Sequence, residues 1–532
     1  MSAVLAKMPG VTMKISDLKT GFQILSRLPL ANSQQADREI NHFLDSLLEA
    51  PPASDVYLQL LEQTRISLCF VEEDLARHYS SKALPLGEIE EAAFQQVVAT
   101  WLKAARAYAH CAQLQDGDDG ERLALILHRC IYYTGMAIVE HDRARRQLPE
   151  GLWLDLHGFY ASAEEWGVAT VAVPDSLDPL GRTTHCTAAF VSLLLIELAG
   201  PYSLTVRELG LVRRWAAAWS PLVSIHPALA GNPLPPLVVD LMHDSGLRAA
   251  NDCLQTENVR RVDIARLAAQ INETKRQLQK KIQPMQLGLG EDCTSAQCHR
   301  LLDRLARPWC LLRAARRFRR HRATGIAKVC SGFTAMHYYI SGTEFSQPEN
   351  ARIYSRQEFD NMFTFRHGLD PTQGLEVRRS HLGLAVDDWE VLDQSANGFR
   401  LLRSTAGRRL APEQLLAICP HDGSAHLLAQ VVWLMQEQGG GLVAGVAALA
   451  GKPQAVAARQ LSQSAGHADS YSRAFMLPAF PAIGEEQSLV IPAGWFYPDR
   501  LLEVYVDGVW RVRLQQLLSE GPDFERVTFR IT

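Results

Sequence analysis

The spacing of hydrophobic residues changes part-way along this chain, and that change constrains the fold more than any other feature. Before residue 220, apolar side chains recur at three and four positions, as in Ile40, Phe43, Leu44 and Leu47. This spacing is typical of an amphipathic helix. From Ile326 onward, short apolar runs are separated by turn signals, which is typical of strands. The sequence therefore predicts a helical front part and a β-rich rear part, a multidomain α+β protein.

The front part, residues 1–220, is expected to be an all-α helical bundle or a stack of helical hairpins. No fixed repeat period runs convincingly through it. The longest apolar run contains Ser192 and Glu197 and is too short to span a bilayer, so we expect a buried helix there. The clearest expected helices lie near residues 40–50, 94–105, 122–146, 153–166, 187–199 and 206–219.

The remaining chain is expected to contain three further parts. Residues 221–312 are predicted to be a linker with a short β-element and connecting helices, because prolines are frequent between 221 and 236. Short strands separated by turns in residues 313–455 suggest a β-barrel or a β-sandwich, and residues 456–532 suggest an additional C-terminal β extension. Strands are expected near residues 237–241, 326–330, 335–340, 389–402, 415–419, 425–434, 441–449, 488–492, 501–506, 509–514 and 526–531.

Composition limits the classes of protein that this chain can belong to. Its 532 residues, with 47% hydrophobic and 21% charged side chains, are sufficient for several globular domains. A formal net charge of −4 argues against general binding to nucleic acid polymers or membrane surfaces. Ten scattered cysteines suit free thiols in a reducing compartment. With no signal peptide or spanning segment in view, we expect a cytoplasmic protein without membrane insertion.

Two polar segments of the rear part have the chemistry of a ligand site. Residues 313–322 contain six arginines, whose guanidinium groups suit phosphate oxygens and guanine edges. Residues 393–398 form a turn between strand-like runs and bring together Asp393, Ser395 and Gly398. A carboxylate and a hydroxyl there can accept from and donate to a planar ligand. No catalytic or metal-binding motif of comparable strength is present, so we expect neither an enzyme nor a metalloprotein.

Together these two segments resemble the paired signature of the PilZ domain, a small β-barrel that binds cyclic di-GMP. The resemblance implies a PilZ-like antiparallel β-barrel at residues 313–455. Arg316 and Arg320 match its R-x-x-x-R element, and Asp393, Ser395 and Gly398 match its D/N-x-S-x-x-G element. The resemblance implies that the two arginines contact phosphates or guanines and that the aspartate accepts from guanine N–H groups. It also implies that the serine adds a hydrogen bond and that the glycine leaves room for the ligand.

The chain departs from the family pattern between its two elements. Seventy-two residues separate Arg320 from Asp393, which implies an insertion at about 341–387 with a short helical pattern at 355–363. Such an insertion can loop outward at small entropic cost. It contains competing arginines, and those at 317 and 319 could also contribute if the motif boundary is shifted. The competing arginines are Arg352, Arg356, Arg378 and Arg379.

Two functions follow from the resemblance. The first is a cyclic di-GMP receptor or adaptor in bacterial signalling, with no other cofactor, whose helical part engages an unidentified protein partner. The second is a non-enzymatic interaction scaffold with a degenerate PilZ-like barrel that binds no ligand. For the turn at 393–398, the architectural alternative is an Asx-type turn that satisfies its own backbone. For the arginines, it is a solvated helix end.

Overall fold

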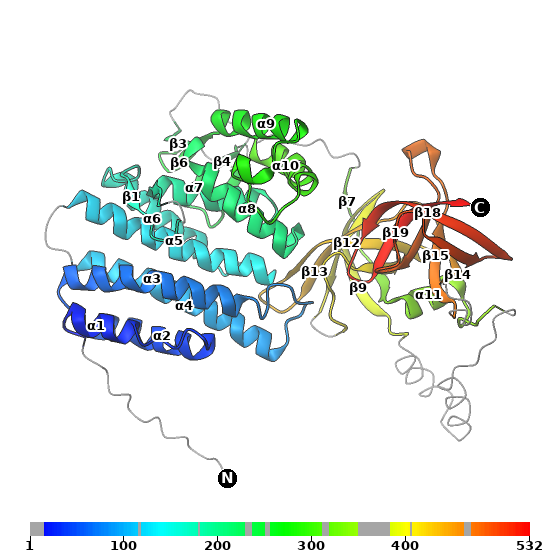
Figure 1. The fold of residues 1–532 in the computed structure, drawn as a ribbon, viewed down its shortest axis with the longest axis horizontal. Helices are drawn as coiled ribbons and strands as arrows, with labels where there is room; N and C mark the ends of the chain where they lie inside the picture. The colour runs from blue at the N-terminus through cyan, green and yellow to red at the C-terminus, as the bar shows by residue number, and fades with distance from the viewer. Residues whose placement is uncertain are drawn as a thin grey trace, which may run out of the picture. The chain divides into compact units, whose positions relative to one another are not determined.

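The chain divides into two compact units, which are described separately (Figure 1). Unit 1 comprises Met1–Lys82 and Leu86–Ala315, and unit 2 comprises Ala83–Pro85 and Arg316–Thr532. The computed structural model describes residues 15–114, 119–178, 181–228, 237–250, 256–310, 319–348, 384–404, 407–461 and 470–532.

The first half of unit 1 is a bundle of long helices around one hydrophobic core. Trp101 is fully buried in that core and stacks on Tyr133, with ring centroids 5.8 Å apart. Asn32 caps the second helix by accepting a hydrogen bond from the Gln35 amide at 3.1 Å, and Pro51 follows its end. The helices are α1 (Leu18–Leu25), α2 (Ser33–Glu49), α3 (Ser54–Ala76), α4 (Glu88–Gln113) and α5 (Gly120–Ala144). The helical front part is confirmed.

The second half of unit 1 adds shorter helices and small sheets around another core. The indole N–H of Trp215 donates to Leu289 at 2.9 Å, and that of Trp309 donates to Leu195 at 2.8 Å. Both tryptophans are therefore buried with their polar atom satisfied. The helices are α6 (Leu152–Glu165), α7 (Cys186–Leu198), α8 (Val206–Trp219), α9 (Ala265–Gln279) and α10 (Ser295–Trp309). One sheet pairs β1 (Val173–Pro174) with β2 (Thr183–Thr184), and the other has the order β3 (Ser224–Pro227), β6 (Val259–Asp263), β4 (Leu237–Asp240), β5 (Leu247–Ala249).

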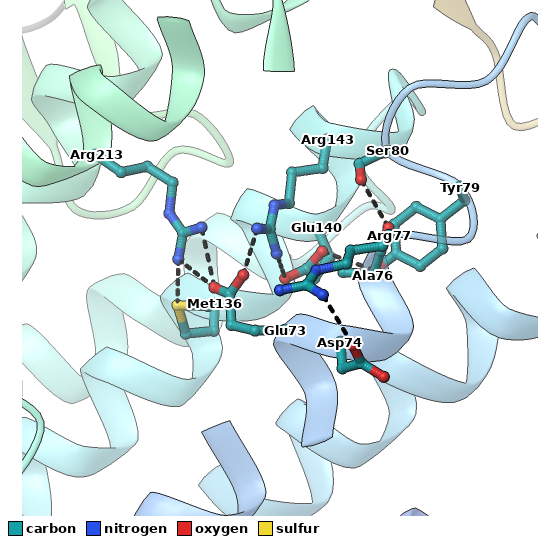
Figure 2. A network of polar contacts seen from close by, with 10 residues as sticks. All are labelled: Glu73, Asp74, Ala76, Arg77, Tyr79, Ser80, Met136, Glu140, Arg143 and Arg213. Atoms are coloured by element: carbon teal, nitrogen blue, oxygen red, sulfur yellow. Dashed lines mark hydrogen bonds and ion pairs between the residues drawn. The ribbon is translucent and has the colours of Figure 1, made fainter. Parts of the chain in front are cut away.

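A charged cluster connects α3, α5 and α8 inside unit 1. Figure 2 shows Glu73 of α3 accepting hydrogen bonds from both Arg143 of α5 and Arg213 of α8. Arg143 also donates to Glu140 at 2.9 Å, and the Tyr79 hydroxyl donates to the other oxygen of Glu140 at 2.7 Å. Burial opposes ionisation of Glu73, but the two arginines together hold the pKa of its carboxyl below the usual value. The cluster therefore fixes the three helices relative to one another through ionised groups.

One helix of unit 1 has the length and apolar composition of a membrane span. Within the described part of the chain this helix is α5. In its most apolar stretch of 18 residues, 83% is buried. The same property is typical of a central helix in a globular core. The shorter apolar helix α7 is also largely buried, in agreement with the expectation for residues 188–199.

The first half of unit 2 is a closed antiparallel barrel of six strands. Strand pairing runs around a complete ring in the order β8, β9, β10, β13, β12, β11 and back to β8. A short strand, β7 (His321–Arg322), precedes β8 and pairs with the far end of β9. The ring consists of β8 (Ile326–Ser331), β9 (Asp387–Ser395), β10 (Gly398–Arg403), β11 (Leu415–Cys419), β12 (Leu427–Gln436) and β13 (Leu442–Ala448).

The strand expected at 335–340 is wrong, because these residues belong to helix α11 (Phe333–Ser341). Gly332 has a φ of 82°, which ends β8 and redirects the chain. Ala335 and Met336 are fully buried in a core that also contains residues of the C-terminal barrel. In a short run of mainly apolar residues, the spacing of polar and apolar side chains cannot distinguish a strand from a helix. The helical pattern expected at 355–363 lies outside the described residues.

The C-terminal residues close a second barrel, with the order β14, β15, β16, β19, β18, β17. Alternate side chains of β15 enter two cores: Ala474 and Met476 lie inside the second barrel, while Phe475 and Leu477 pack with Leu415 of the first. The two barrels therefore share buried surface within unit 2. The strands are β14 (Gln454–Gln460), β15 (Ser472–Leu477), β16 (Ser488–Pro492), β17 (Leu501–Tyr505), β18 (Val509–Glu520) and β19 (Phe524–Ile531).

Candidate ligand-binding site

The turn predicted at 393–398 is a tight hairpin between β9 and β10 of the first barrel. Ser395 and Gly398 pair directly across it, and Asp393 pairs with Arg400. The Ser395 hydroxyl lies 3.0 Å from the Asn397 side-chain oxygen and 3.4 Å from the Gly398 carbonyl oxygen. This hydroxyl is therefore engaged within the turn, as expected for a side chain that stabilises its own hairpin.

Arg320 and Asp393 meet despite their separation in sequence. The Arg320 guanidinium donates to the Asp393 carboxylate at 2.7 Å, and the two side chains are 32% and 20% exposed. The pairing of β7 with β9 causes this contact, because Arg322 lies directly opposite Asp393. Arg320 lies two residues earlier, just before β7, and its guanidinium reaches the same carboxylate. One motif residue from each segment, Arg320 and Asp393, thus meets the other.

Further polar and aromatic side chains continue the same row across the sheet. Arg400 lies opposite Asp393 on β10, Gly445 lies opposite Arg400 on β13, and Trp433 lies opposite Gly445 on β12. A Cβ at Gly445 would overlap the indole nitrogen of Trp433, so the ring lies over this glycine. The Arg400 guanidinium carbon is 5.9 Å from the Trp433 ring centroid, within the range of a cation–π contact.

The row combines the group types that a nucleotide requires. Arg322 and Arg400 are exposed cations on either side of the half-buried Asp393 carboxylate, and a half-buried indole lies beyond Arg400. Guanidinium groups bind phosphate oxygens and guanine acceptors in pairs, and a carboxylate accepts from base N–H donors. An indole offers a flat surface for base stacking. We call this row, Arg320, Arg322, Asp393, Arg400 and Trp433, the barrel row.

Gly398 has a structural role in the barrel beside the ligand clearance that the resemblance implies. A Cβ at this position would overlap the carbonyl oxygen of Val446 on the neighbouring strand β13. The absence of a side chain therefore permits close strand pairing in the barrel itself. Of the expected arginines, Arg316 and Arg317 lie outside the described residues, and so do Arg352, Arg356, Arg378 and Arg379.

Two members of the barrel row were not singled out from the sequence. Arg400 follows Gly398 by two positions in one strand, so the strand period could have placed it on the same face as the motif. Trp433 could not have been found in this way, because its place beside Arg400 depends on the register of three strands. Among the residues that the structure describes, no group of three or more histidine, cysteine, aspartate or glutamate side chains is arranged to hold a metal ion.

Comparison with known proteins agrees with this architecture. Three family models match in order: the N-terminal domain of the cyclic-di-GMP receptor FimW at residues 20–229, its middle PilZ domain at 237–374, and its C-terminal β-barrel domain at 456–532. This chain is a PilZ-domain protein. It is 24% identical to the cyclic-di-GMP receptor FimW of Pseudomonas aeruginosa, over 91% of this chain and 85% of the relative. No solved structure matches it.

The family matches of this PilZ protein cover the arginine segment of its site but not the segment that contains Asp393. The middle-domain match ends at residue 374 and includes Arg320 but not Asp393. Support for the barrel row as one site therefore comes from the strand register and from the Arg320–Asp393 contact, and the family match does not extend over all of it. The C-terminal match agrees with the second closed barrel.

Proposed function

We propose that this PilZ protein is a cyclic di-GMP receptor and that the barrel row is its ligand-binding site. The observation that carries the proposal is the Arg320–Asp393 contact, which joins the two signature segments where β7 pairs with β9. The FimW relative, which is named a cyclic-di-GMP receptor, supports the same ligand. The site residues proposed are those of the barrel row together with Arg316, Ser395 and Gly398.

Each charged group of the row has a counterpart in the ligand. Cyclic di-GMP has two phosphates and two guanines, so three guanidinium groups can divide between phosphate oxygens and the guanine O6 and N7 acceptors. Asp393 accepts from the guanine N–H groups. Trp433 stacks on one base, which is worth about 1–3 kcal/mol for a base on an aromatic ring.

Binding replaces one contact of the free protein. Arg320 and Asp393 neutralise each other without ligand, and both must turn at least part of their hydrogen-bonding capacity toward the dinucleotide. The ligand therefore acts on a preformed ion pair, and it shifts the population of conformations rather than undergoing a reaction. We propose a non-enzymatic adaptor of the bacterial cytoplasm whose helical unit engages a protein partner.

Calorimetric titration with cyclic di-GMP tests this function. Arg320→Ala and Trp433→Ala are each expected to weaken binding about tenfold or more, the equivalent of roughly 1.4 kcal/mol. Lys328→Ala is the matched control, because Lys328 is 63% exposed on the same barrel and forms a surface ion pair with the exposed Asp388 at 3.0 Å. Wild-type protein that gives neither heat nor a thermal shift would favour the scaffold with a degenerate barrel.

A further inference from the structure

The outward surface of the second barrel carries a group of arginines unrelated to the barrel row. Val512 and Leu514 of β18 point into the barrel core. Because side chains alternate along a strand, Arg511 and Arg513 point outward. Arg513 lies directly opposite Arg530 of β19 on one side and Leu501 of β17 on the other. We call Arg511, Arg513, Arg530 and the apolar neighbour Leu501 the arginine face.

The positive charge of this face is poorly neutralised. Arg513 is 3.8 Å from Asp499, and both side chains are more than half exposed, which makes this a weak pair. Arg511 is 3.7 Å from Glu503, but Glu503 already accepts a hydrogen bond from Arg459 at 2.7 Å. Within the described ranges, no ion pair with a carboxylate is recorded for Arg530, which is exposed.

The direct opposition of Arg513 and Arg530 has an energetic consequence. Like charges placed opposite each other on neighbouring strands destabilise a sheet. A pair that is unfavourable for the free barrel becomes favourable when an anion lies between the two guanidinium groups. The arrangement therefore points to binding of a negatively charged partner.

The form of the barrel restricts how such a partner binds. Strand β14 pairs with β17, so the six strands close and leave no continuous free edge for an added strand. Recognition must therefore use side chains. Leu501, directly opposite Arg513, is 38% exposed and places apolar surface beside the arginines.

The composition of the barrel favours a protein partner over a membrane. Residues 454–532 contain seven arginines, no lysine and nine carboxylates, so the barrel as a whole is not cationic. An anionic membrane attracts clusters of excess positive charge, whereas arginine is enriched at protein interfaces even where the net charge is not positive. We propose that the arginine face binds an acidic protein segment that carries carboxylates next to an apolar side chain.

Fluorescence anisotropy with the full chain tests this proposal. The probe is a labelled ten-residue peptide that alternates aspartate or glutamate with leucine, and the control peptide has lysine in place of each acid. Wild-type protein is expected to bind only the acidic peptide, more weakly as salt is added. Arg513→Glu and Arg530→Glu are each expected to weaken binding about tenfold. Arg77→Glu, at the C-cap residue of α3 whose side chain is 80% exposed, is expected to leave peptide binding unchanged.

A second variant separates lost binding from lost folding. Arg530→Gln removes the like-charge opposition, so the Tm is expected to stay within about 2 °C of the wild-type value or to rise, while peptide binding falls. The proposal is overturned if the glutamate variants bind the acidic peptide as tightly as the wild type. It is also overturned if wild-type protein prefers vesicles of anionic phospholipid to the peptide, or if Arg530→Gln lowers the Tm by many degrees.

Discussion

The signature glycine at position 398 offers a direct test of what this part of the motif does. A Cβ there would lie closer than 3.0 Å to the Val446 carbonyl oxygen, a distance that real Cβ atoms essentially never adopt. Because the obstacle is backbone, no side-chain rotation can relieve the overlap. In Gly398→Ala, β10 and β13 must therefore separate at this point of the barrel.

The cost of this separation can be estimated. Overpacking that moves the backbone costs about 1–3 kcal/mol, and Gly398 pairs with Ala447 at the end of the β10–β13 ladder, where some movement is possible. We therefore expect Gly398→Ala to lower the free energy of unfolding of unit 2 by about 2 kcal/mol. Urea denaturation followed by tryptophan fluorescence measures this, since Trp389 and Trp433 lie in the first barrel.

A matched variant controls for the substitution itself. Gly439 is exposed, and a Cβ there would meet no atom within 4 Å, so Gly439→Ala is expected to change stability by less than about 0.5 kcal/mol. If Gly398→Ala is as stable as this control yet loses cyclic di-GMP binding, the strand-clearance explanation is wrong. The glycine would then serve the ligand, as the family resemblance implied.

Three further substitutions test the energetics of half-buried carboxylates. Glu73→Gln is expected to lower the stability of unit 1 by about 2 kcal/mol in urea denaturation, because two arginines lose an ionised acceptor. Burial raises the pKa of Glu197 to about 7 from 4.5, although the Leu247 amide donates to it. Its folded pKa exceeds its unfolded pKa, so the stability present below pH 4.5 is lost as the pH rises through 7, by up to about 3 kcal/mol. Thermal unfolding of Glu197→Gln from pH 5 to 8 is expected to depend less on pH than that of the wild type. Glu525 accepts from three backbone amides of residues 494–496, so Glu525→Gln is expected to lower the stability of the second barrel by about 1–2 kcal/mol, and an unchanged denaturation midpoint would contradict this.

The accuracy of the sequence-based predictions varied with the length of the repeating pattern. Long amphipathic segments such as α2 and α4 were placed correctly because several turns of apolar residues agree on one face. The six residues of 335–340 were misassigned as a strand because a short apolar run is compatible with either period. Burial against the second barrel decided that they form a helix.

The candidate site likewise has features that the local sequence predicted and features that depend on the fold. The resemblance to the paired PilZ motif predicted that Arg320 and Asp393 belong to one site, and the two side chains are in contact in the structure. The structural uses of Ser395 and Gly398 were accessible only once the hairpin and its neighbouring strand were in place, because they depend on the Asn397 side chain and the Val446 carbonyl.

The amino-acid sequence alone determined that this chain has a helical front and a β-rich rear with a PilZ-like pair of segments, because local periodicity and short motifs are properties of neighbouring residues. The tertiary structure alone decided that the rear closes into two barrels and that Trp433 lies beside Arg400 over Gly445. Strand register sets these contacts, and register depends on pairing between residues distant in the chain, which no local pattern specifies.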